Sequence, residues 1–260
     1  MSAVTPFQTA RALAAGYAPR VLQPRGWVLA ALVLAPVGLV LAISAVAAMQ
    51  GHSLSPGVTL TVFHTILAKA TLPIMALIAA SAGIREDLEQ RTLPLLLTRP
   101  AAVWAMPLGK GLPWFAWGAI WLTAASLGLQ ILGGDPGLLM GRIGALVGAW
   151  WGELAFVALF GLVFKRGTLW AALWLFGWEN LVAVFPPLLQ RLTFTHYIES
   201  LAGSRGHSVS ATELLAQAQV STDPWLALAI LFLAGLGLWL ACGWKLHSTP
   251  VGLAGVEAEG

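Results

Sequence analysis

The sequence predicts an all-α membrane protein, built as one bundle of six transmembrane helices. The first observation is composition, because 58% of the 260 residues are hydrophobic and only 10% are charged. Soluble domains carry about 25% charged residues. The second observation is spacing, because apolar runs of about the 20 residues that a membrane crossing requires recur six times. Backbone groups in lipid must find partners within their own segment, so each run is expected to be a helix.

The six runs divide the chain into three parts. Residues 1–25 precede the bundle, residues 26–245 form it, and residues 246–260 form a tail rich in glycine and small residues. The predicted spans are residues 27–49, 58–84, 111–132, 143–164, 168–189 and 225–244.

Basic residues predict which side of the membrane the loops occupy. An even number of spans places both termini on one side, and positively charged loops mark the cytoplasmic side. With the termini inside, ten of the 14 Lys and Arg residues lie in cytoplasmic segments. Arg142, Arg191 and Arg205 lie outside, and Lys69 lies within a span. The sequence therefore predicts cytoplasmic N- and C-termini, with residues 190–223 as the longest outer loop.

Two further features of the apolar chain carry expectations. Residues 5–25 are weakly amphipathic, with Phe7, Ala10 and Leu13 on one helical face, which predicts a short helix on the inner membrane surface. A disordered tail is the alternative. Several of the 13 tryptophans lie near span ends, as interfacial belts require. Trp150 and Trp151 fall in mid-span and are expected to pack or to face lipid.

The densest mixed-charge stretch lies between the second and third spans, on the predicted cytoplasmic side. Glu86, Asp87 and Glu89 alternate there with Arg85 and Arg91. Asp87 and Arg91 are spaced i,i+4 with the acid first, which supports a helix. A short amphipathic helix along the inner surface is expected, although a proline at position 94 removes one backbone bond. An ordinary solvated loop is the alternative.

The stretch "IREDLEQRTLPLLLTRPAAVWAMPLGKGL" resembles the membrane-spanning subunit of ABC-2 type ABC transporters. That family carries an acidic short helix after its second span, then a leucine cluster, an Arg-Pro pair and a Gly-Lys pair. The matching residues here are Glu89, Thr92, Leu93, Leu95 to Leu97, Arg99, Pro100, Gly109 and Lys110. The six-span layout matches as well, whereas Arg91 stands where the family often has glycine.

The resemblance implies that the acidic segment is a coupling helix, which rests on separate ATP-hydrolysing subunits. It implies contact through Arg85, Glu86, Asp87, Glu89, Arg91 and Thr92. ATP and Mg²⁺ would be bound by the partner ATPase, with no cofactor in this chain. A second copy is expected to complete a homodimer, with a related permease chain as the alternative. The expected function is export across a prokaryotic inner membrane. The alternative is a membrane anchor or assembly subunit for a cytoplasmic ATPase, without transport.

The sequence argues against an ATPase or another enzyme within the chain itself. A P-loop requires G-x-x-x-x-G-K-[ST], and the one Gly-Lys pair, Gly109-Lys110, is followed by glycine and lacks the earlier glycine. The single cysteine, Cys242, excludes an intramolecular disulfide and a cysteine-based zinc site. The few basic residues suit membrane topology, so no nucleic-acid partner is expected.

Four polar residues interrupt the predicted spans, namely Lys69, Glu153, Glu179 and Asn180. A charge at mid-span costs about 2.5–3.5 kcal/mol on insertion scales, so such residues face a partner or a watery cavity. They could line a transport route, or Lys69 could form an ion pair with Glu153 or Glu179. Asn180 is expected to bond across helices.

Two weaker hypotheses involve the same acidic chemistry. An intramembrane enzyme could use Glu153 and Glu179. His196 and Glu199 at i,i+3 could ligate a metal, although two ligands make an incomplete site. No metal site is therefore predicted.

Overall fold

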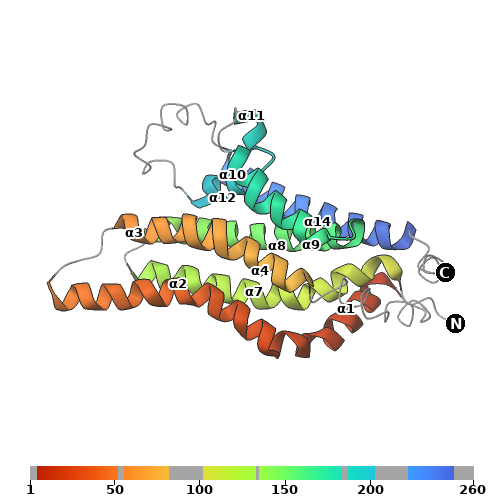
Figure 1. Cartoon of the computed structure of the whole chain (residues 1–260), viewed down its shortest axis with the longest axis horizontal. Coiled ribbons are helices and arrows are strands. Elements are labelled where there is room, and N and C mark those ends of the chain that lie inside the picture. Colours follow the sequence, from red (N-terminus) through yellow and green to blue (C-terminus); the bar gives the residue numbers. More distant parts are fainter. Residues whose placement is uncertain are drawn as a thin grey trace.

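The computed structural model describes residues 5–51, 56–81, 102–132, 135–182, 187–202 and 222–248. Every regular element within these ranges is helical, which confirms the predicted all-α class. The long helices lie roughly side by side and form one elongated bundle (Figure 1).

Within the described ranges, five helices are long and apolar enough to cross a membrane. They include α2 (Pro24–Met49), α7 (Met106–Ile131) preceded by η4 (Val103–Ala105), and α14 (Pro224–Ser248). A further crossing combines α3 (Pro56–Thr61), the π-helical η2 (Val62–Thr71) and α4 (Leu72–Ala80). The last joins η5 (Pro136–Leu138) to α8 (Leu139–Val163). These helices overlap five of the six predicted spans, and they support a multi-pass membrane protein.

The remaining predicted span, 168–189, is helical wherever the structure describes it, at residues 168–182 and 187–189. It consists of α9 (Gly167–Ala172), the π-helical η6 (Leu173–Trp178) and α10 (Glu179–Val182), and α11 (Pro187–Gln190) follows. The helical run that the structure describes extends from Gly167 to Val182, and residues 183–186 lie outside the described part of the chain. It lies obliquely to the long helices (Figure 1). The count of six spans therefore stays a prediction.

Large apolar side chains cover the outside of the bundle. On α14, Leu226, Leu233 and Leu240 recur every seven residues and are all more than half exposed. On α2, Leu39 and Val46 are equally exposed. A soluble protein rarely leaves such continuous apolar surface in water, so this exterior fits contact with lipid.

One end of the bundle gathers segments that are far apart in sequence. Helix α1 (Pro6–Tyr17) lies against the start of α7, and the backbone N–H of Ala102 donates to Thr9 Oγ1 at 3.2 Å. Met106 and Leu246 form a small buried cluster there, with Leu162 packed against it. The beginning of α7 and the ends of α8 and α14 therefore meet at the end of the bundle that holds α1 (Figure 1). We call it the α1 end.

The structure contains a helix in the N-terminal segment, where the sequence predicts one. A helix forms over Pro6–Tyr17, and Thr5 and Gln8 cap it reciprocally, which satisfies backbone donors that the helix leaves open. Its buried face holds Thr9 and Ala10, whereas Phe7 is 75% exposed. The expectation that Phe7 faces the membrane surface stays a prediction.

The core is packed by indole rings seated against glycines. Trp150 lies over Gly118 and donates its Nε1–H to Phe115 O at 3.1 Å. Trp151 lies over Gly235 and donates to Phe232 O at 3.2 Å. Glycine lets each ring approach the neighbouring backbone, and the indole N–H is satisfied by a carbonyl there. Both tryptophans are buried, so their mid-span positions serve packing.

Candidate functional site: a polar cluster in mid-bundle

The four polar residues predicted within spans line one small cavity. Lys69 comes from η2, Glu153 from α8, and Glu179 and Asn180 from α10. The remaining lining residues are Ala68, Pro73, Leu175 and Thr195. The cavity holds about 10 Å³, which is room for roughly one water molecule. Glu153 lies near the middle of α8, so the cluster lies about halfway along this helix.

A short helix within the stretch predicted as an outer loop completes the cluster. Helix α12 (Phe194–Ala202) packs against α8 and buries His196, Ile198 and Leu201. The ring of Phe194 fills the space beside Gly152 in the middle of α8. At the other end of α12, the carbonyl of Leu201 approaches Gly141. Helix α12 therefore lies along the N-terminal half of α8, because its apolar face needs a partner.

Lys69 forms an ion pair with Glu199 of α12. Its Nζ lies 3.4 Å from Glu199 Oε1, and the two side chains are 39% and 32% exposed. Sequence reasoning expected Glu153 or Glu179 as the partner. Glu199 takes that role because α12 packs beside η2, which the sequence pattern did not reveal.

Glu179 caps the N-terminus of α12 from another helix. Its Oε1 accepts the backbone N–H of Phe194 at 2.9 Å. Its Oε2 accepts the N–H of Thr195 at 3.0 Å and the Thr195 hydroxyl at 2.6 Å. The first turn of a helix leaves N–H groups without intrahelical partners and carries a partial positive charge. A carboxylate placed there is therefore stabilised, and it fixes α12 to α10.

The carboxyl of Glu153 differs from those of Glu179 and Glu199 in its lack of a described partner at Oε2. Its side chain is 3% exposed, and its Oε2 has no hydrogen-bond partner among the residues that the structure describes. Lys69 is held by Glu199, and the donors at the start of α12 are taken by Glu179. Glu153 therefore faces the cavity without a counter-charge of its own.

Asn180 corrects another expectation. Its Nδ2–H donates to Phe176 O at 2.7 Å, four residues earlier in the same helix, whereas a bond across helices was expected. The π-helical turn over Leu173–Trp178 explains the difference. A π turn disturbs the regular i→i−4 bonding, and a polar side chain can satisfy the carbonyl that is left.

The sequence did not point to Thr195 and Glu199 as cluster residues. Their i,i+4 spacing places them on one face of α12, which is a usable signal once that helix is known. The metal hypothesis had paired Glu199 with His196. In the structure, His196 Nε2 lies 3.1 Å from Thr222 Oγ1 while Glu199 contacts Lys69. Within the described ranges, no group of three or more His, Cys, Asp or Glu side chains could hold a metal.

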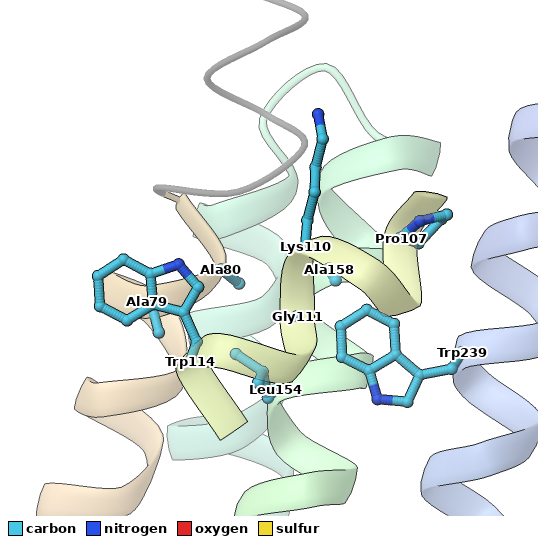
Figure 2. Close-up of a pocket in the computed structure, with 9 residues that line it drawn as sticks. All are labelled: Ala79, Ala80, Pro107, Lys110, Gly111, Trp114, Leu154, Ala158 and Trp239. Atoms are coloured by element: carbon cyan, nitrogen blue, oxygen red, sulfur yellow. The ribbon is translucent and has the colours of Figure 1, made fainter. Parts of the chain in front are cut away.

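A second cavity, of about 20 Å³, lies nearer the α1 end (Figure 2). It is lined by Ala79, Ala80, Pro107, Lys110, Gly111, Trp114, Leu154, Ala158 and Trp239. Figure 2 shows the Lys110 side chain extending away from it, and Lys110 Nζ lies 5.0 Å from the centre of the Tyr17 ring of α1. Lys110 is 1% exposed, so its ammonium group is buried near Tyr17 together with its stem. The cavity itself is apolar and offers no chemistry.

The residues assigned to ATPase contact lie outside the described part of the chain. They are Arg85, Glu86, Asp87, Glu89, Arg91 and Thr92. The residues that flank this segment, Ser81 and Ala102, are described, and both lie at the α1 end.

No protein-family model, curated protein or solved structure matches this chain.

Proposed function

We propose that this chain is the membrane-spanning subunit of an ABC-2 type transporter, driven by separate ATPase subunits that dock on residues 85–99. It would act as an exporter in a prokaryotic inner membrane, as a homodimer. The proposal rests on the sequence motif together with the position of the described residues on either side of it.

The observation that carries the proposal is the gathering of segments at the α1 end. The flanks of residues 82–101, helix α1 and the end of α14 all belong to this end. Most of the described basic residues are here as well, namely Arg11, Arg20, Arg25, Lys110, Lys165, Arg166 and Lys245. Under the positive-inside rule this end would face the cytoplasm, where separate ATPase subunits could dock on it.

A sixth crossing completes the proposed topology. The run α9–η6–α10 starts at the α1 end, beside Phe160, and α14 starts at the opposite end and returns to the α1 end. The chain must therefore pass from one end of the bundle to the other between residues 167 and 224. The oblique run and the residues that follow it would make that passage.

Co-purification tests the proposed docking directly. The tagged full chain would be extracted from its own cells in mild detergent, and the proteins that follow it identified by mass spectrometry. We expect a P-loop ATPase with the native chain and a loss of at least tenfold with the combined Glu86→Gln, Asp87→Asn and Glu89→Gln variant. Charged groups set register and specificity at such an interface, so amides should disrupt it.

A matched control changes acids at the opposite end. Asp135→Asn with Asp223→Asn alters two exposed helix caps, and asparagine caps a helix as well as aspartate does. This variant should retain the ATPase. Failure to recover any P-loop ATPase with the native chain contradicts the proposal. Equal recovery with both variants places the docking surface elsewhere.

A second measurement distinguishes a transporter from a membrane anchor for the ATPase. The complex reconstituted in vesicles should hydrolyse ATP faster in the presence of a transported compound. A docked ATPase whose rate responds to no compound, and which moves none, identifies an anchor.

A further inference from the structure

We propose that Glu153 is a reversible proton-binding site in the middle of the bundle, with its carboxyl protonated at neutral pH. The proposal does not depend on transport or on any ATPase. It follows from the contacts within the polar cluster, in which Lys69 is paired with Glu199 and the N–H donors of α12 are bonded to Glu179.

Glu153 is the carboxyl of the cluster that the described residues leave without compensation. Lys69 is paired with Glu199 at 3.4 Å, and Glu179 receives three donors from Phe194 and Thr195. An ionised carboxylate that is buried without a partner is far more costly than a neutral acid. A proton is the smallest positive ligand that removes this cost.

Among the described residues, no contact of the elements around Glu153 brings a further positive charge to its carboxyl. Helices α4 and α9, which pack against α8, carry no titratable side chain. Helix α12 also packs against α8, and its His196 Nε2 lies 3.1 Å from Thr222 Oγ1. On α14 the thiol of Cys242 contacts Ala155 O at 3.8 Å, while Lys245 and His247 lie at the last turn. Lys110 of α7 extends toward Tyr17, His64 lies on η2 five residues before Lys69, and Arg142 lies eleven residues earlier on α8.

The small cavity offers a place through which the proton can be exchanged. Its volume suits about one water molecule, and polar atoms of Asn180 and Thr195 line it beside the carboxyl. A water there could receive the Glu153 proton. On deprotonation, Lys69, which lines the same cavity, could move toward Glu153, and this move would weaken the pair that ties η2 to α12.

Infrared spectroscopy tests the protonation state without reference to function. The full chain would be reconstituted in phosphatidylcholine vesicles, and the carbonyl band of a protonated carboxylic acid recorded across a pH series. We expect this band at neutral pH, and we expect its complete loss in Glu153→Gln. Glutamine has the shape of the protonated acid, so the variant should fold and melt like the native chain.

Two further variants make the test decisive. Asp135→Asn replaces an exposed acid and should leave the band unchanged. Glu199→Gln releases Lys69 to serve as a counter-charge, so the band at neutral pH should shrink at least twofold. An undiminished band in Glu199→Gln would contradict the argument from missing counter-charge, even if Glu153→Gln failed to fold.

The remaining outcomes overturn the proposal. Absence of the band in the native chain at neutral pH shows that Glu153 is ionised. Survival of the band in Glu153→Gln assigns the proton to another residue. Loss of the band when sodium replaces choline in the buffer identifies a metal-cation site in place of a proton site.

Discussion

Helix α8 presents two different surfaces to the rest of the bundle. Toward α7 and α14, Trp150 and Trp151 pack against glycines, and each indole N–H is bonded to a neighbouring carbonyl. Toward η2, α10 and α12, the same helix presents Glu153 to a cavity lined by charged groups. The first surface depends on the complementary shapes of the indole rings and the glycines. The second depends on the pairing of charged side chains with their partners. Substitutions that change size should therefore damage one, and substitutions that change charge should damage the other.

The largest effect is expected from removing the inter-helix cap. Glu179→Leu leaves the N–H groups of Phe194 and Thr195 and one hydroxyl without their charged acceptor. Hydrogen bonds to charged groups contribute about 1.5–3 kcal/mol each, so we expect a loss of roughly 2–5 kcal/mol. Thermal unfolding of the purified chain in mild detergent would measure it. Asn180→Leu is the matched control, because it removes one bond within its own helix and should cost about 1 kcal/mol. Equal losses in the two variants would show that the cap is dispensable.

The shape-specified surface is tested by a pair of glycines on α14. In Gly235→Ala the added methyl group would meet the indole of the buried Trp151, whereas in Gly237→Ala it meets nothing within 4 Å. Overpacking costs about 1–3 kcal/mol, so Gly235→Ala should lower the unfolding temperature. Gly237→Ala should be neutral or stabilising by about 0.5–1 kcal/mol, because alanine favours a helix. The packing account fails if the two variants unfold at the same temperature.

The smallest effect is expected at the ion pair. A double-mutant cycle with Lys69→Met and Glu199→Gln should give a coupling energy of less than about 1 kcal/mol in detergent, because both side chains are partly exposed. Repeating the cycle in lipid vesicles sharpens the comparison. A coupling that grows in vesicles would place the pair in a low-dielectric environment, whereas an unchanged value would place it in contact with water.

The sequence was sufficient to predict the helical class and the five apolar helices. Each of these helices is long, continuous and bounded by polar residues or prolines. The sequence also singled out Lys69, Glu153, Glu179 and Asn180, because a charged or amide side chain in an apolar run is conspicuous. The structure places all four around one cavity.

The partners of those residues could not be predicted in the same way. Glu199 and Thr195 belong to a short helix within a polar loop, and only tertiary packing brings α12 against α8 and η2. The bond of Asn180 to Phe176 depends on a π turn, which leaves no clear periodic signal in the sequence. Local pattern therefore found the unusual residues, whereas the pairing between them required the fold.

The oblique run from Gly167 to Val182 has a consequence for the surrounding bilayer. If it belongs to the sixth crossing, its tilt means that each residue advances less than about 1.5 Å along the membrane normal. A hydrophobic stretch that is long for its membrane accommodates by tilting further, at a cost of fractions of a kcal/mol per ångström. The depth of Glu179 and Asn180 would then vary with the thickness of the bilayer. Bilayer thickness would become a variable that tunes how readily water reaches the cluster.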